Sequence, residues 1–265
     1  HAALAETERD GLLIDRREEG LSGLSGLKTL GALERLVRLF KDTPDTCYLE
    51  VGVFQGLSLV SVALGVPGYP CFGIDNFSIL DPDGRNLGIT QNRMATFGVT
   101  NATLINRDFE AALANLDAHL DGRRVAVYFV DGAHDYRSQL MGLLLALPCL
   151  HENAVILIDD ANYAFVRQST RDFLGTHADW RMVFEAYSPA HPANLDAEAL
   201  ARYEAGWLNG INILVRDPEG LLGDMRPAED PRKPLYVNDW LVHRHLMAPL
   251  APQALDLAQA LHTGE

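Results

Sequence analysis

The chain has 265 residues, of which 48% are hydrophobic and 22% charged, and it is long enough for one large globular domain with appended segments. Its 36 acidic and 22 basic residues give a formal net charge of −14, which disfavours nucleic acid and anionic lipid as partners. No apolar run approaches the roughly 18 residues of a membrane helix, and no signal peptide is evident. Cys47, Cys71 and Cys149 are widely spaced in apolar surroundings, so we expect buried thiols and a cytoplasmic protein.

The first 44 residues predict an N-terminal helical cap, because apolar side chains recur at helical spacing over Leu27–Phe40 and Pro44 then interrupts the pattern. Residues 45–217 predict the core, in which short apolar strands alternate with helices. The expected strands are Cys47–Val53, Pro70–Asp75, Ala102–Arg107, Arg124–Asp131 and Ala154–Asp159, and the expected helices are Leu57–Leu64, Gln91–Phe97, Phe109–Leu120, Arg137–Leu150 and Val166–Leu174. This alternation is typical of an α/β fold with a doubly wound, mostly parallel sheet covered on both faces.

Two further strands are expected at Arg181–Ala186 and Ile211–Arg216. The segment between them, residues 187–209, is too long for a tight turn and contains a helical pattern at Leu195–Ala205, so it predicts a lid over the site. Residues 218–265 predict a C-terminal helical extension, with its helical pattern from Leu235 to His262. We expect such an accessory helix to serve a homo-oligomer.

A glycine-bearing turn follows the first strand of the core, in the stretch YLEVGVFQGLSLVSVAL. Glu50 ends the strand, Gly52 and Gly56 flank the turn, and Ser58 opens the next helix. Glycines at such a turn let the backbone approach a ligand closely. The spacing differs from the phosphate-cradling pattern G-x-G-x-x-G, and it suits a ligand without phosphate whose ammonium or ribose donates to Glu50.

Acids also end the next two strands. Asp75 closes the second strand, where a carboxylate is placed to bind a ribose diol, and Asp108 follows the third, where it can address an adenine amino group. Either acid alone could be a solvated strand end; their succession together with both glycines favours a cofactor site. This set resembles the class I S-adenosylmethionine methyltransferases, over Tyr48–Arg216. The resemblance implies a Rossmann-like methyltransferase fold with S-adenosylmethionine as cofactor.

A second acid cluster follows the fourth and fifth strands, in VYFVDGAHDY and AVILIDDANY. Asp131 ends one strand, and Asp159 and Asp160 end the other. Since carboxyl ends of parallel strands share one edge of a sheet, these side chains should converge. Three close carboxylates repel one another unless a cation lies among them, and oxygen ligands favour Mg²⁺ or another hard divalent ion. The alternative is three separate solvated acids.

The cluster resembles that of two groups of metal-dependent O-methyltransferases: the catechol and caffeoyl-CoA type, and the sugar O-methyltransferases of macrolide pathways. The resemblance implies that Asp131, Asp159 and Asp160 hold the metal and that Asp131 also lies beside the cofactor. The Asp–Asp pair is closer to the macrolide-sugar group, because the catechol group has Asp–Asn.

His134 departs from the catechol group, which carries a lysine base at this position. Histidine has an unperturbed pKa of about 6.5 and can accept a proton from an acceptor hydroxyl, so we interpret His134 as the general base. The alternative is a helix-start residue bonded to the backbone. Asp135 is expected only to cap the following helix. Several nearby side chains could face the substrate, although packing or surface roles are favoured for them: Asn162, Tyr163, His191, Tyr203, Trp207 and Asn209.

These patterns together predict a Mg²⁺-dependent enzyme that methylates a hydroxyl of a small molecule, more readily a natural-product sugar or polyol than a catechol. Two alternatives stay open from the sequence. The same scaffold could carry out a non-methyl reaction such as hydroxylation, or it could bind a nucleoside without turnover.

Overall fold

The computed structural model describes residues 1–228. The helical pattern predicted for Leu235–His262 lies outside the described residues. None of the helices in residues 1–228 combines the length and the apolar composition that spanning a bilayer requires. All three cysteines of the chain are buried and free, as expected.

One seven-stranded sheet organises the molecule, in the order β3-β2-β1-β4-β5-β7-β6. The strands are β1 (Thr46–Val51), β2 (Cys71–Ile74), β3 (Ala102–Ile105), β4 (Arg124–Val130), β5 (Leu150–Asp159), β6 (Trp180–Ala186) and β7 (Ile211–Arg216). Strands β1 to β5 pair in parallel, whereas β7 runs antiparallel to both β5 and β6. The predicted doubly wound, mostly parallel sheet is confirmed. Its strand order reverses between β1 and β4, where ligands bind in folds of this type.

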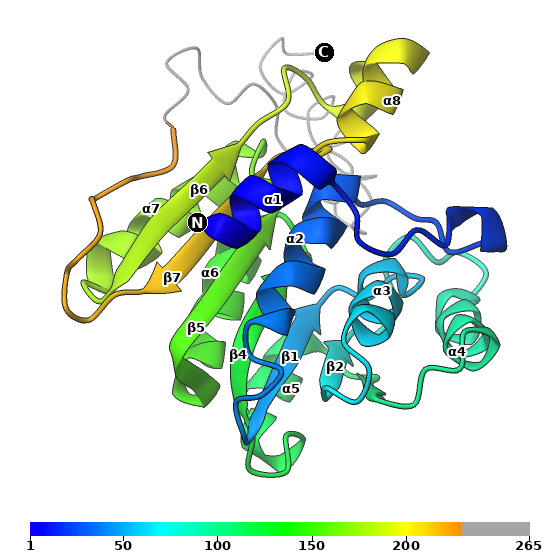
Figure 1. Ribbon diagram of the computed structural model, residues 1–265, viewed down its shortest axis with the longest axis horizontal. Helices are drawn as coiled ribbons and strands as arrows, with labels where there is room; N and C mark the ends of the chain where they lie inside the picture. Colours follow the sequence, from blue (N-terminus) through cyan, green and yellow to red (C-terminus); the bar gives the residue numbers. More distant parts are fainter. Residues whose placement is uncertain (229–265) are drawn as a thin grey trace, which may run out of the picture.

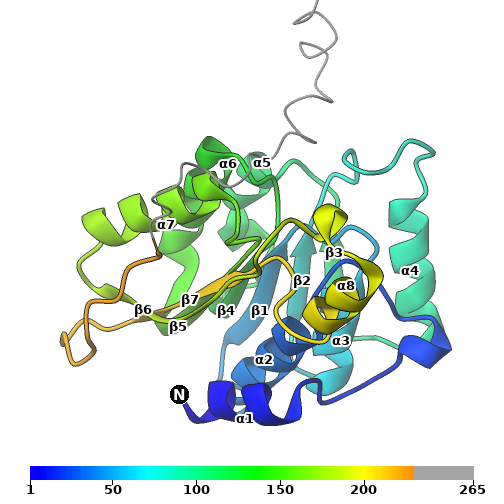
Figure 2. The same ribbon diagram turned by 90° about the horizontal axis from the view of Figure 1, so that it is seen from above.

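Helices cover both faces of the sheet (Figures 1 and 2). On one face lie α1 (Ala2–Asp10), α2 (Leu27–Arg38) and α3 (Leu57–Gly65); on the other lie α5 (Phe109–Leu113), α6 (Tyr136–Ala146) and α7 (Ala164–Thr176). Helix α4 (Asn86–Thr96) lies at the β3 end of the sheet. Because side chains alternate along a strand, Leu49 of β1 joins the core under α5 to α7 and Tyr48 joins the core under α1 to α3.

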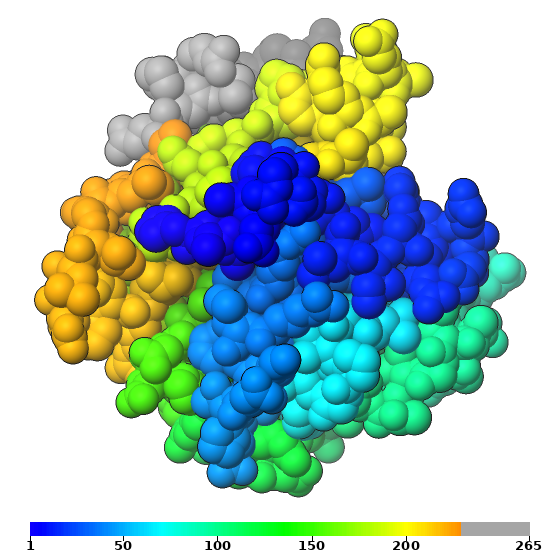
Figure 3. All heavy atoms as spheres, viewed as in Figure 1, coloured from blue at the N-terminus to red at the C-terminus, as the bar shows by residue number. Residues whose placement is uncertain are grey.

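The insert of residues 187–209 folds back to the N-terminal helices. It contains a 3₁₀ turn, η4 (Pro192–Asn194), and α8 (Ala197–Glu204), which matches the predicted helical piece. The Lys28 amide donates to the Gly206 carbonyl at 2.9 Å, and the Trp207 indole N–H donates to Glu8 of α1 at 2.5 Å. Figure 3 shows α1 in dark blue beside the yellow insert.

Several helices differ in extent from the sequence prediction, among them α6, which ends at Ala146 rather than Leu150. Helix α4 begins at Asn86 rather than Gln91, because the Asp81 carboxylate accepts the amides of Arg85 and Asn86 at 2.6 and 3.1 Å and caps the helix early. The helix predicted over Phe109–Leu120 is shorter in the structure, because α5 ends at Leu113. A separate short 3₁₀ turn, η2 (Leu116–Ala118), follows it.

Candidate active site at the carboxyl edge of the sheet

The strand registers bring the predicted site residues to one level. Val51 of β1 lies opposite Ile74 of β2 and Val130 of β4, and Val130 lies opposite Ile158 of β5. The residues that follow these strand positions therefore meet at the carboxyl edge, as predicted: they are Gly52, Asp75, Asp131 and Asp159.

Gly52 brings the glycine turn against Asp131. Its φ is +95°, and a Cβ atom there would lie 1.7 Å from the backbone oxygen of Asp131. Gly56, with φ +80°, ends the turn, and a Cβ there would lie 2.8 Å from the Thr90 methyl group. Both positions need glycine for backbone conformation and for space. The turn is therefore packed directly against the loop after β4, which carries Asp131 of the second acid cluster.

Glu50 lies fully buried beneath this turn. Its Oε2 accepts the Tyr48 hydroxyl at 2.6 Å, whereas its Oε1 has no hydrogen-bond partner among the described residues. Burial raises the pKa of Glu50 to about 8. Ser58 is buried nearby at the start of α3. The unpaired Oε1 of Glu50 could accept a hydrogen bond from a bound cofactor. The cofactor contacts of Glu50 and Ser58 remain predictions.

Asp75 and Asp108 both accept hydrogen bonds from backbone amides, a role that their positions in the sequence do not predict. Asp75 accepts the amides of Val53 and Phe54 at 2.9 and 2.8 Å, and that of Phe77 at 2.7 Å, so its carboxylate holds the glycine turn in shape. Asp108 is exposed and caps α5 through the amides of residues 110 and 111. Their predicted contacts with ribose and adenine would come in addition to these structural roles.

Three side chains converge as a group that could hold a metal ion: Asp131, His134 and Asp160. One ligand atom from each lies within 4.8 Å of the others. His134 Nε2 is 3.8 Å from Asp131 Oδ1 and 2.6 Å from Asp160 Oδ2, yet within the described part of the chain it makes no well-aligned hydrogen bond. The side chains are 17–25% exposed, so the group is partly shielded from water. A nitrogen and two carboxylates facing one another in this way fit a divalent cation.

The charges of this group reinforce that conclusion. Burial and the neighbouring charge of Asp160 raise the pKa of Asp131. Burial opposes protonation of His134, but the carboxylates of Asp160 and Asp131 outweigh it and raise the pKa of His134 to about 10. Burial also opposes ionisation of Asp160, but His134 and Asn209 outweigh it and lower its pKa. The carboxylates thus require positive charge, which the imidazolium or a metal ion can provide.

Asp159 lies outside this group of three, although it was predicted as a metal ligand. It is the last residue of β5, opposite Ile211 of β7, and its side chain is buried. Burial, with the charges of Asp131 and Asp160, raises its pKa well above the usual range. His134 occupies the third place in the group instead. A ligand role for Asp159 stays a prediction, and its proximity to both acids keeps it in the candidate set.

Residues for which the sequence favoured packing roles make contacts around the group. The Tyr163 ring stacks on His134, with centroids 5.2 Å apart and planes at 18°, and its hydroxyl lies 3.0 Å from His191 Nε2. The side-chain amide of Asn209 donates to Asp160. Asp135 caps α6 by accepting the amide of residue 138, as expected. Trp207 packs away from the group, against Phe184 and α1.

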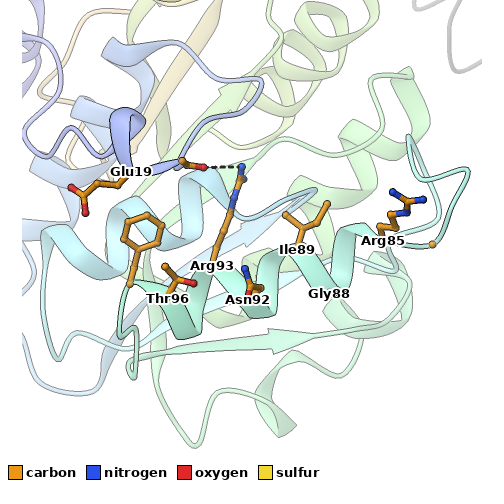
Figure 4. Close-up of a pocket in the computed structure, with 10 residues that line it drawn as sticks. Glu19, Arg85, Gly88, Ile89, Asn92, Arg93 and Thr96 are labelled. Atoms are coloured by element: carbon orange, nitrogen blue, oxygen red, sulfur yellow. Dashed lines mark hydrogen bonds between the residues drawn. The ribbon is translucent and has the colours of Figure 1, made fainter.

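A pocket of about 560 Å³ lies elsewhere, between the 3₁₀ turn η1 (Arg17–Glu19) and α4 (Figure 4). Arg93 crosses it and donates to the Gly20 carbonyl at 3.3 Å. None of the predicted site residues lines this pocket, so we do not assign it to the site.

Comparisons with known proteins agree with this fold. Residues 49–161 match a family model described as a methyltransferase domain. The O-methyltransferase TomG from Streptomyces achromogenes, solved with SAM, is similar to this chain with 17% identity and a TM-score of 0.55, over 82% of this chain and 96% of TomG. An O-methyltransferase from Bacillus cereus, solved with SAH, has 11% identity and a TM-score of 0.55, over 82% and 91%. CalS11, described as a TDP-rhamnose 3'-O-methyltransferase of calicheamicin biosynthesis, has 17% identity and a TM-score of 0.52, over 80% and 90%.

No curated protein sequence matches the chain significantly. The family match covers the glycine turn and both acid clusters, and the solved structures share the fold. The resemblance to the class I methyltransferases is therefore confirmed, and the chain carries a methyltransferase domain.

Proposed function

We propose that this methyltransferase uses a divalent cation, Mg²⁺ in the first instance, to transfer a methyl group from S-adenosylmethionine to a hydroxyl of a small molecule. The observation that carries the proposal is the convergence of Asp131, His134 and Asp160 beside the Gly52 turn. The proposed acceptor is a natural-product sugar or polyol. The fold likeness to CalS11, whose described substrate is a sugar nucleotide, supports this class of acceptor.

The roles of the residues follow from their positions. Bound S-adenosylmethionine would supply the methyl group, and the cation would lower the pKa of the acceptor hydroxyl. Glu50, Gly52 and Asp75 would hold the cofactor, with Asp131 and Asp160 holding the cation and Asp159 as a further ligand. His134 would stay outside the ligand set and accept the hydroxyl proton, because a cation held by the carboxylates offsets their charge and leaves the imidazole neutral.

The reaction is tested by incubating the protein with S-adenosylmethionine, Mg²⁺ and a panel of glycosides, polyols and phenols, and measuring product mass. We expect a gain of one methylene group, loss of turnover in EDTA, and recovery on adding Mg²⁺. Full activity in EDTA would show that the reaction needs no divalent cation. A gain of one oxygen would instead support hydroxylation, and cofactor binding without conversion of any acceptor would support a non-catalytic scaffold.

The base assignment is tested by His134→Ala. We expect turnover to fall by about 10²- to 10⁴-fold, because the proposed general base would be missing. Affinity for S-adenosylmethionine, measured by calorimetry, should stay near that of the wild-type protein. His119→Ala, which changes a histidine outside the site, is the matched control. An unchanged rate with intact cofactor binding would show that His134 is not the base.

A further inference from the structure

We propose that the insert, residues 187–209, positions the metal site through Asn209 and His191 and is thus a working part of the site as well as a cover. This inference rests on the proposed function, since it concerns how the same site holds its cation. Neither residue belongs to the group of three. Asn209 acts through Asp160, which is a member of the group, and His191 acts through Tyr163 in the turn after β5.

The turn from Asp160 to Tyr163 is fastened to both ends of the insert. At the start, the Asn162 side chain donates to the Ser188 carbonyl and accepts the Ser188 amide, each at 3.0 Å, and Asn162 is buried. At the end, the Ala161 amide donates to the Gly210 carbonyl at 3.2 Å, and the Asn162 amide donates to the Asn209 carbonyl at 3.0 Å. The base of the insert and the turn therefore form one hydrogen-bonded unit.

Asn209 fixes the orientation of Asp160 within this unit. Its side-chain amide donates to Asp160 Oδ1, while Asp160 Oδ2 faces His134. A donor held on one carboxylate oxygen sets the direction of the other, which is how groups behind metal ligands commonly tune metal sites. Asn209 is itself buried, so its amide is held in place by packing.

His191 fixes Tyr163, and through it the plane of His134. Its Nδ1 accepts the Ala193 amide at 3.1 Å, which places the proton of the neutral ring on Nε2. That nitrogen lies 3.0 Å from the Tyr163 hydroxyl and donates to its oxygen. The Tyr163 ring in turn lies nearly parallel to the His134 ring. Rotation of the His134 imidazole is thus limited by a residue of the insert.

The test measures metal and cofactor affinity separately in the full chain, with Mn²⁺ followed by electron paramagnetic resonance and S-adenosylhomocysteine followed by calorimetry. For Asn209→Ala we expect Mn²⁺ affinity to fall by about 10- to 100-fold, with cofactor affinity unchanged. His191→Asn should give a smaller loss of Mn²⁺ affinity. Its amide can still cap η4 by accepting the Ala193 amide, but it is too short to reach Tyr163. Asn194→Ala, an exposed position of the same insert, is the matched control and should behave as the wild type.

The outcomes separate this inference from the proposed function. Wild-type Mn²⁺ affinity in both Asn209→Ala and His191→Asn would overturn the inference and leave the proposed function standing. If the wild-type protein binds S-adenosylhomocysteine but no Mn²⁺, the metal part of the proposed function fails, and the inference fails with it. Should Asn209→Ala lose both ligands, Asn209→Leu, which keeps the volume of the side chain but has no donor, decides: selective loss of Mn²⁺ affinity supports the inference, and wild-type Mn²⁺ affinity overturns it.

Discussion

At the scale of single residues, backbone conformation determines which side chains the site can use. Gly52 has a positive φ, and its missing side chain leaves room for the backbone of Asp131. Gly68 has a comparable φ of +79°, but a Cβ there would meet nothing within 4 Å. A side chain at Gly68 would therefore cost only the free energy of a left-handed conformation. A side chain at Gly52 would cost that free energy and would also clash with Asp131.

We expect Gly68→Ala to lower the free energy of unfolding by about 1 kcal/mol, the cost of a left-handed residue with a side chain. Gly52→Ala should cost clearly more and should also weaken binding of S-adenosylmethionine, because the turn must move away from Asp131. Urea unfolding and calorimetry measure the two effects. Equal destabilisation by the two substitutions, with cofactor binding intact, would contradict the close approach described for Gly52.

The residues of the candidate site were predictable to different degrees. Asp131 and Asp160 stand out in the sequence because each follows an apolar strand, and parallel strands bring their ends together. The approach of His191 and Asn209 was not predictable, because it depends on how the insert folds between two antiparallel strands. The binding of three amides by Asp75 also depends on tertiary structure.

At the scale of elements, Trp207 joins the insert to the N-terminal helices. Its ring contacts Phe184 of β6 at a centroid distance of 4.8 Å, and its indole N–H donates to Glu8 of α1. Helix α1 was not predicted, because Leu4 is the one large apolar side chain among its nine residues and a helix this short is marginal without tertiary contacts. Its contacts with α2 and Trp207 provide the stabilisation that so short a helix lacks on its own.

Trp207→Ala should lower the free energy of unfolding by about 3 kcal/mol, because it removes a buried indole between two elements. Trp207→Phe keeps most of the apolar contact and loses the hydrogen bond to Glu8, so we expect a loss of about 1 kcal/mol. Leu24→Ala, at a side chain that is 65% exposed, is the control. A Trp207→Ala protein as stable in urea as this control would show that the indole contributes little to the fold.

At the scale of the whole molecule, a buried carboxyl on α2 links stability to pH. Glu34 is fully buried, its Oε2 accepts the Leu13 amide at 3.0 Å, and its Oε1 has no hydrogen-bond partner within residues 1–228. Burial raises its pKa from 4.5 to about 7, and the amide of Leu13 only partly offsets the effect. Between these two values the folded chain holds a proton that the unfolded chain has released.

The sign of the effect follows from that difference in protons. Stability should fall as pH rises from about 4.5 to about 7, and Glu34 should add no further change above its folded pKa. In Glu34→Gln the slope over this window should be less steep by up to about 1.4 kcal/mol per pH unit. Urea unfolding at a series of pH values measures it, with the exposed Glu198→Gln as control. An identical slope in wild type and Glu34→Gln would show that Glu34 titrates normally.

The backbone at Asp160 also limits how this site can change by mutation. Asp160 has φ +55°, a left-handed conformation that aspartate and asparagine tolerate far better than β-branched or bulky residues. Both of these side chains also offer an oxygen to a cation, so substitution between them changes the charge at this position without changing the backbone. Glutamate, although an equally good ligand by its chemistry, would add the cost of a left-handed conformation, about 1–2 kcal/mol. A test of the proposed metal role that leaves the backbone of this turn undisturbed therefore exchanges Asp160 for asparagine.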